Sequence, residues 1–336
     1  MHGHRKHGVG RAALRRAGGI VVLVGASCAL AATRLPAQVV EGLPTYEPSN
    51  PVIAARSGVL APAIVEPRPG WSFGAAIEYG SAIERRIVMP RAFLLDAEVL
   101  RVRFTAVRGL GPHAFALAQW GVAGGWAGFA DSFFDGYHDM IGFVMPERDA
   151  RPRNTYGAWL RLPAHDITWS APARPLAVSD ARLAVGWRPA PWSQTLLAVT
   201  LPVAREGLYA RGVPTVTVAP SLRLRAGASA LVEGSVALGW APRHGALRAV
   251  QREWNALASL GAQWRPAARF ALFGSLTTQT ASYAHTGLPE LDKGALVGEV
   301  GAALGGPRRR WRVSFEEDIR RDDPGLDLVL KVSTGW

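Results

Sequence analysis

The segment WNALASLGAQW, residues 254–264, alternates apolar side chains with small or polar ones along its whole length. Trp254, Leu260 and Trp264 belong to one set, and Asn255 and Gln263 belong to the other. Ten steps of ~3.3 Å make a strand roughly 33 Å long. A tilt of about 40° leaves roughly 25 Å along the membrane normal, the height of the apolar band on an outer-membrane barrel. We therefore predict a membrane-crossing strand with an indole at each interface.

The same period of two recurs after residue 70, in segments of about ten residues separated by Gly, Pro and charged turns. Alternation predicts strands near 71–79, 92–107, 112–121, 153–162, 164–171, 180–188, 193–203, 213–225, 229–240, 252–264, 268–280, 292–304, 309–320 and 326–336. The weakest of these is 164–171. A barrel with both termini on one side has an even number of strands, and we expect about 12–14 strands here. Tight links at 108–113 and 264–268 are expected in the periplasm, and the loop 283–292 outside.

Composition supports this fold class. The chain has 336 residues, of which 49% are hydrophobic and only 19% charged, below the ~25% of soluble domains. With 37 Gly and 24 Pro it is rich in turn residues, which excludes a helical bundle, and it is too apolar for a disordered chain. Outside the N-terminus no apolar run reaches the ~20 residues of a spanning helix, so a multi-helix membrane protein is also excluded.

The formal net charge of +12 is concentrated at the N-terminus. The first 38 residues contain no acid and six cations: Arg5, Lys6, Arg11, Arg15, Arg16 and Arg34. Removing these six leaves +6 on a surface where both signs are interspersed. A nucleic-acid-binding protein carries its basic charge on one face, so we expect no nucleic-acid partner.

Residues 1–38 are typical of a secretory signal, with a cationic region, an apolar stretch of about 16 residues and then small residues. Two sites suit cleavage, Ala29–Ala31 and Leu35–Ala37. An uncleaved N-terminal anchor is the alternative. Acylation at Cys28, as in a lipoprotein, is disfavoured because Gly25 stands where an apolar residue is needed. Since Cys28 is the single cysteine, the exported chain has no disulfide.

Two of the predicted strands need an irregularity in their alternation. Asp96 and Glu98 occupy even positions, whereas Arg101 and Arg103 occupy odd ones. A bulge near 99–100 would place all four on the inner face. Regular strands carry other charges at inward positions, among them Glu78, Arg182 and Glu233. Pro220 interrupts a second alternating row, and we expect a bend or bulge there.

Residues 122–152 are the one stretch without strand periodicity. Apolar residues recur there at helical spacing, and Asp131, Asp135 and Asp139 recur every four residues beside His138. Such groups can bind a cation or a basic ligand. The alternative is the wet face of a helix that caps the barrel, with Arg148, Arg151 and Arg153 as salt partners. Collinear Asp residues seldom converge on one metal, so neither a metal ion nor another cofactor is expected.

This insert resembles the central motif of the bacterial family known as domain of unknown function 3187. The resemblance rests on Phe129–Asp131, Asp135–Asp139, Ile141–Phe143 and Pro152–Asn154, and it extends weakly over residues 43–336. Members are predicted outer-membrane barrels without an assigned activity. The resemblance therefore implies location and fold, and it implies no catalytic residues.

The chain end resembles the C-terminal signal by which outer-membrane barrels are recognised. Residues 326–336 alternate and end in the aromatic Trp336. This resemblance implies the barrel-assembly machinery as a partner, with Trp336 as the assembly signal.

Enzyme motifs are absent from the sequence: it has no G-x-S-x-G, no H-E-x-x-H and no P-loop. His165, followed by Asp166, is the nearest approach to a catalytic pair. We therefore assign no catalytic residue. An outer-membrane lipid-modifying enzyme and a structural or adhesive barrel remain as alternatives.

The sequence thus predicts an all-β protein: a transmembrane antiparallel up-and-down β-barrel over 70–336, with one helical loop insert. Residues 39–69 are expected in the periplasm, where they plug the barrel mouth. The predicted function is passage or binding of an unidentified small solute through a narrow, helix-gated lumen, in contact with outer-membrane lipid. The candidate ligand-binding residues are Asp96, Glu98, Arg101, Arg103, Asp131, Asp135, His138, Asp139, Arg148 and Arg153.

Overall fold

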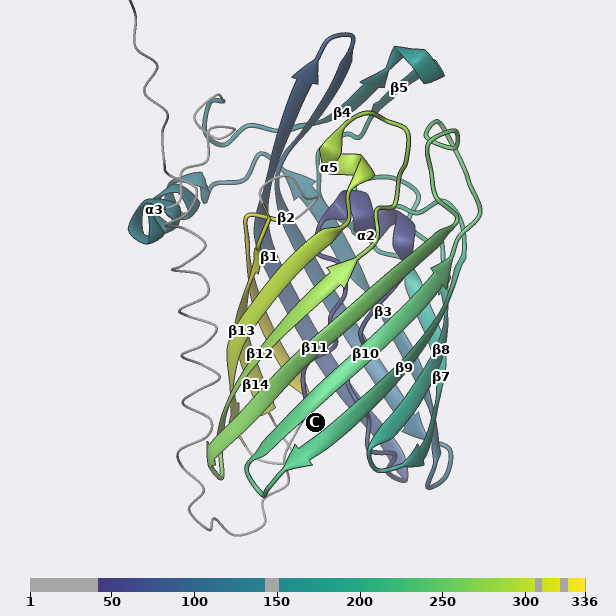
Figure 1. Ribbon diagram of the computed structural model, residues 1–336, viewed down its shortest axis with the longest axis vertical. Coiled ribbons are helices and arrows are strands. Elements are labelled where there is room, and N and C mark those ends of the chain that lie inside the picture. The colour runs from purple at the N-terminus through teal and green to yellow at the C-terminus, as the bar shows by residue number, and fades with distance from the viewer. Residues whose placement is uncertain (1–41, 143–150, 306–309, 321–325, 336) are drawn as a thin grey trace, which may run out of the picture.

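The computed structural model describes residues 42–142, 151–305, 310–320 and 326–335. Twelve strands of this described chain form a closed antiparallel barrel, in which each strand pairs with its neighbours and β2 pairs with β3 (Figure 1). The twelve are β1 (Gly70–Val88), β2 (Arg91–Gly109), β3 (Ala114–Trp126), β7 (Ala181–Ala190), β8 (Ser193–Leu201), β9 (Thr215–Ala226), β10 (Ala230–Trp240), β11 (Trp254–Ala267), β12 (Phe270–Gln279), β13 (Ala295–Gly305), β14 (Arg310–Asp318) and β15 (Leu328–Gly335). The predicted fold class is confirmed.

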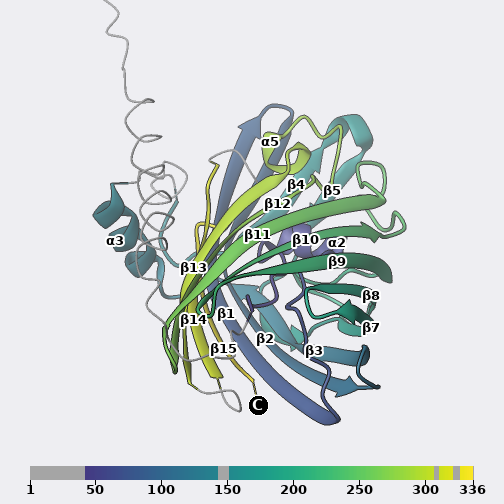
Figure 2. The ribbon, with the colours of Figure 1, turned by 60° about the horizontal axis from the view of Figure 1, so that its bottom comes forward.

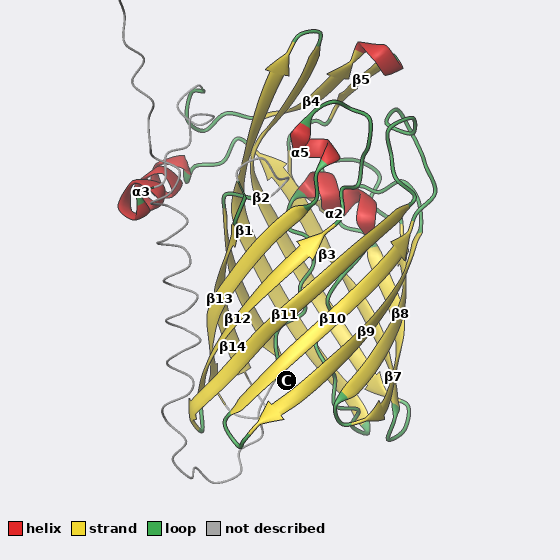
Figure 3. Cartoon of the chain, in the orientation of Figure 1, coloured by secondary structure: helices red, strands yellow, loops and turns green. Residues whose placement is uncertain are grey.

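The two ends of the barrel differ in the length of their connections (Figure 3). Strands β7 and β8 are joined through residues 191–192, and β11 and β12 through 268–269. The opposite end carries the longer loops 202–214, 241–253 and 280–294. Outer-membrane barrels have short periplasmic turns and long extracellular loops, so we call the first end the periplasmic end and the second the extracellular end.

The alternation predicted for residues 254–264 is confirmed. Trp254 and Leu260 are 58% and 62% exposed on the outer wall, whereas Asn255 and Gln263 are buried in the lumen. Other tryptophans form two bands on the wall, as amphipathic rings do at membrane interfaces. Trp240 pairs with Trp254 near the extracellular end. Trp71, Trp187 and Trp311 lie at the strand ends near the periplasmic end.

Three short strands lie outside the barrel wall, at its extracellular end. β4 (Gly157–Leu162) pairs with the upper part of β2, β5 (Ile167–Ser170) pairs with β4, and β6 (Arg174–Val178) pairs with β3. The segments 153–162 and 164–171 are therefore not barrel strands. Their assignment to the barrel was wrong because β1 and β2 are each 19 residues long. The β1–β2 hairpin continues above the rim of the barrel, where β2 offers an edge with which β4 pairs.

The predicted bulge in β2 is wrong, and no bulge occurs at Pro220. β2 keeps one register with β1 and with β3, without a shift at 99–100. Asp96 and Glu98 therefore point outward, away from Arg101. β9 likewise keeps one register with β8 and β10 through Pro220. The charges on β2 need no bulge, because its outer face is covered by protein at that height.

Residues 42–69, the plug segment, run inside the barrel and are not a periplasmic domain (Figure 2). The helix α2 (Pro51–Ser57) lies near the extracellular end, between two legs that are joined by the bridge between Tyr46 and Ala61. Asn50 caps the helix by accepting a hydrogen bond from Val52 N, and Gly58 ends it with φ 63°. The plug therefore fills much of the lumen, and its placement in the periplasm alone is corrected.

The helix α3 (Asp131–Ile141) lies outside the barrel wall, not over the lumen (Figure 1). Its Phe134 stacks on Tyr79, which points outward from β1. The expected helix-gated lumen is therefore wrong. The remaining short helices, η1 (Pro163–His165) and α5 (Pro289–Asp292), lie in extracellular loops. No helix among the described residues is long and apolar enough to span a membrane.

Candidate functional site

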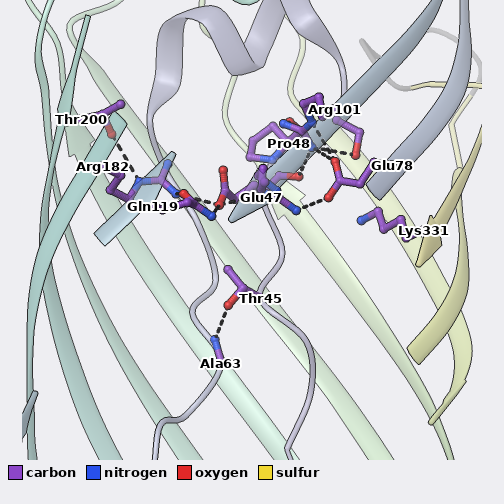
Figure 4. Close-up of polar contacts among 12 residues, drawn as sticks. Thr45, Glu47, Pro48, Ala63, Glu78, Arg101, Gln119, Arg182, Thr200 and Lys331 are labelled. Atoms are coloured by element: carbon purple, nitrogen blue, oxygen red, sulfur yellow. Dashed lines mark hydrogen bonds and ion pairs between the residues drawn. The ribbon is translucent and has the colours of Figure 1, made fainter. Parts of the chain in front are cut away.

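The middle of the lumen holds a cluster of paired charges that joins the plug to the wall (Figure 4). Glu47 of the plug accepts hydrogen bonds or ion pairs from three side chains of three wall strands. Its Oε1 lies 2.9 Å from Arg103 Nη1 on β2, 2.7 Å from Arg182 Nη1 on β7 and 2.9 Å from Gln119 Nε2 on β3. A single plug carboxylate therefore ties together three adjacent strands of the twelve-stranded wall.

Glu78 on β1 completes this cluster from the wall side. It accepts from Arg101 Nε at 2.7 Å and also pairs with Arg103. Arg101 Nη1 in turn donates to the carbonyl of Pro48 at 2.8 Å. We call Glu47, Glu78, Arg101, Arg103 and Arg182 the mid-lumen ion cluster. Its charges are mutually compensated, since three cations face two acids and several backbone carbonyls.

Electrostatics keep Glu47 ionised. Burial favours the neutral carboxyl, but the attraction of Arg103 and Arg182 outweighs burial and holds the pKa of Glu47 well below its ordinary value of 4.5. Removing one partner of a buried ion pair costs free energy, because it leaves an uncompensated charge. The cluster is thus a strong closure, in which Glu47 is the charged side chain that the plug contributes.

A second set of contacts fixes the plug near the periplasmic end. Glu233 on β10 accepts from Leu43 N at 2.7 Å and from Arg223 Nε at 2.5 Å. Arg312 Nη2 on β14 donates to the carbonyl of Gly42 at 2.9 Å. A Cβ at residue 42 would lie 2.2 Å from Arg223 Nη2, so a larger residue there would displace the end of the Arg223 side chain.

The extracellular end of the lumen is closed by the plug helix and the loops above it. Arg56 of α2 donates to the carbonyls of Ala241, Pro242 and Arg252. Apolar residues from the loops, among them Leu208, Val250 and Leu288, form one buried cluster with Ala54. Polar anchors and apolar packing together hold α2 beneath the loops.

Between these closures and the periplasmic end lies a cavity of about 670 Å³. Its lining comprises part of the plug and inward residues of β13, β14, β15, β1, β2, β3, β7, β8 and β9. The charged groups among the described lining residues are Arg68, Arg103, Arg182, Arg223, Arg310, Arg312, Lys331, Glu47, Glu66, Glu78 and Glu299. Seven cations thus face four acids, and we call this space the periplasmic vestibule.

Of the predicted ligand-binding residues that the structure describes, only Arg101 and Arg103 face the lumen. Asp96 and Glu98 lie on the outer face of β2. Asp96 pairs with Arg151, while Glu98 accepts hydrogen bonds from Tyr79 and from Ala130 N. The reason is the unbroken register of β2, which places even and odd positions on opposite faces.

The predicted residues of the insert also lie outside the lumen. On α3, Asp131 accepts from Asn154 N at 2.5 Å, Asp135 pairs with Arg153 at 2.8 Å, and Asp139 is exposed. His138 is buried 3.6 Å from Glu317, an outward residue of β14. His138 thus docks the helix against the wall, Asp131 and Asp135 hold it to residues 153–154, and none of these groups lines a path for a solute. Arg148 lies outside the described residues, as do Trp336 and residues 1–38.

Sequence reasoning missed Glu47, the central acid of the ion cluster. Its neighbours in the sequence, Tyr46 and Pro48, show no strand or helix period. The only signal was an acid in a segment expected to plug the barrel. Arg182 and Glu78 were found, because each occupies an inward position of an alternating strand.

The two histidines nearest to a catalytic role, His165 and His138, both make structural contacts. His165 lies in the turn η1, and its Nε2 is 2.9 Å from the carbonyl of His285. His138 is buried against the barrel wall. Within the described chain, no group of three or more His, Cys, Asp and Glu side chains could hold a metal ion.

The sequence matches no family model, and no curated protein matches it. The fold is similar to that of an outer-membrane channel from Pseudomonas putida F1, with a TM-score of 0.51 and 12% identity, over 80% of this chain and 95% of that chain. Weaker likenesses include the monoaromatic hydrocarbon channel CymD (TM-score 0.40, 10% identity, 80% of this chain and 88% of that one). Another is the toluene transporter TodX of Pseudomonas putida, with a TM-score of 0.39 and 8% identity, over 89% of this chain and 98% of that chain. The chain therefore has the fold of an outer-membrane channel.

Proposed function

We propose that this protein is an outer-membrane channel for small solutes, which the plug segment holds closed. The observation that carries the proposal is a closed twelve-stranded wall around a vestibule of about 670 Å³, with the plug tied across it by Glu47. A cavity of this size suits a small ligand, since ligand pockets measure about 300–1,000 Å³. The fold shared with the Pseudomonas putida F1 channel supports the same function.

In this proposal residues 1–38 export the chain and Trp336 directs its assembly into the outer membrane. The plug moves to admit a solute, because the mid-lumen ion cluster and the packing of α2 otherwise block the lumen. The resemblance to the family of unknown function 3187 is consistent with this assignment and adds no substrate.

The test is conductance in planar bilayers, with the wild type and Glu47→Gln. Removing one charge of a buried pair costs about 3–5 kcal/mol, and here that cost falls on the attachment of the plug. We therefore expect rare openings in the wild type and an open probability raised about 100-fold or more in the variant. Absence of current from both proteins at every voltage would contradict the channel.

The matched control is Glu206→Gln, which removes a carboxylate from an exposed pair with Arg174. Exposed pairs contribute about 0–1 kcal/mol, and this one joins the extracellular loop 202–214 to β6 and includes no plug residue. Its conductance is expected to equal that of the wild type. A rise equal to that of Glu47→Gln would show that openings reflect general loosening of the barrel.

The pH dependence follows from the lowered pKa of Glu47. The stabilisation that its carboxylate provides is complete above its ordinary pKa of 4.5, and it is lost only as the pH falls through the lowered pKa. Wild-type conductance is therefore expected to stay constant between about pH 7 and about pH 5. Opening on mild acidification would mean that another group controls the plug.

A further inference from the structure

The periplasmic vestibule has an uneven distribution of charge that the channel function alone does not require. Its four acids are all engaged with lining cations or their neighbours: Glu47 and Glu78 in the mid-lumen ion cluster, Glu66 near Arg68, and Glu299 with Lys331. Seven lining cations face these four acids, and two of the cations, at positions 310 and 312, lie on β14. A cavity walled by protein concentrates the field of such an excess and attracts anions.

Arg312 is the residue of that pair with an available donor. Its Nη2 donates to Gly42 O at 2.9 Å, and its Nε is buried without a hydrogen-bond partner in the described part of the chain. A buried guanidinium N–H without an acceptor is costly. A carboxylate that reached Arg312 would supply the missing acceptor, because guanidinium groups bind carboxylates through charge-assisted hydrogen bonds.

Another part of the lining is apolar. Around the barrel the order is β14, β15, β1, β2, β3, and small residues line the wall next to Arg312: Ser333 of β15 and Ser72 and Gly74 of β1. Beyond them β2 and β3 present the half-buried Val107 and Leu117, and the plug adds the half-buried Val65. Besides its paired charges, the vestibule thus offers Arg312 and an apolar patch formed by Val65, Val107 and Leu117.

We infer that the periplasmic vestibule binds a small organic monoanion, a carboxylate attached to a compact aliphatic or aryl body. The carboxylate pairs with Arg312, and the apolar body lies against Val107 and Leu117. This inference rests on the proposed channel function and names its solute class. A cation and an apolar patch in one cavity favour such a molecule over an inorganic anion or a neutral hydrocarbon.

The test is calorimetric titration of the detergent-solubilised, full-length protein with benzoate and with its neutral isostere benzamide. The wild type is expected to bind benzoate about tenfold or more tightly than benzamide, because only benzoate carries the charge. Arg312→Gln is expected to remove this preference and to leave benzamide binding unchanged. The matched control is Arg161→Gln, which replaces an exposed arginine on β4. This variant is expected to keep the preference for benzoate.

Two further measurements keep the inference falsifiable. The heat-dependent gel mobility of Arg312→Gln reports whether its barrel has folded, and the benzoate-to-benzamide ratio of the wild type needs no variant. Equal affinity of the wild type for both compounds overturns the inference, as does an unchanged ratio in folded Arg312→Gln. If vesicles that contain Glu47→Gln pass benzamide as fast as benzoate, the inferred preference for carboxylates is overturned, whereas the proposed channel function is not. Lack of passage of either compound, with benzoate still bound in detergent, instead contradicts the channel.

Discussion

The wall from β10 to β12 and the wall from β1 to β3 follow the same alternation, but different surroundings cover their outer faces. On β11, Leu260 is 62% exposed towards the membrane. On β2, the outward Glu98 is only 1% exposed, because α3 and the chain before it lie over it. Alternation thus tells which side chains point outward, and it does not tell whether they meet lipid or protein.

The outward charges beside α3 are stable because each has a protein partner. Glu98 accepts from the Tyr79 hydroxyl and from a backbone N–H, and Glu317 faces His138. A charge on the lipid-facing part of the wall has no such partner and costs free energy that depends on its depth. The three predictions below test this difference between the two walls.

The largest effect is expected for Leu260→Arg, which places a charge on the lipid-facing wall near its middle. Arginine at the bilayer midplane costs about 2–4 kcal/mol. The free energy of unfolding in lipid vesicles, measured by urea titration, should fall by that amount. The control is Ala267→Arg at the periplasmic end of the same strand, where the cost falls to about 0–1 kcal/mol. Equal losses for both variants would mean that β11 does not cross the apolar band.

A smaller and local effect is expected for Glu98→Ala. The variant leaves the Tyr79 hydroxyl and Ala130 N without their acceptor, and hydrogen bonds to a charged group contribute about 1.5–3 kcal/mol. Amide hydrogen exchange in α3 should accelerate about 10-fold to 100-fold, whereas exchange in β10 to β12 stays unchanged. Faster exchange in both walls would show that the two regions unfold as one unit.

The smallest effect is expected for Arg153→Gln, which removes the exposed partner of Asp135. The side chain of Arg153 is 63% exposed, and such surface pairs contribute about 0–1 kcal/mol. Hydrogen exchange in α3 should change by less than about fivefold. A loss as large as that of Glu98→Ala would place the main attachment of α3 at its solvent-facing side and not at the wall.

The sequence predicted most of the wall and little of the candidate site. All twelve barrel strands coincide with predicted segments, because the period of two is written locally in each of them. Inward residues of regular strands, such as Arg182 and Glu233, were found for the same reason. Asp96 and Glu98 were placed wrongly because their polarity was taken as evidence of a lumen-facing position, whereas protein above the membrane band covers them.

The sequence by itself determined the barrel, the outward tryptophans and the helical character of residues 131–141. Only the tertiary structure decided that the helix lies outside the wall and that residues 42–69 lie inside it. Neither segment carries a period of two, and each is held by partners distant in the chain, as Leu43 is by Glu233, 190 residues away. Local periodicity fixes which face of a strand is apolar, but contacts over such separations depend on the closed barrel.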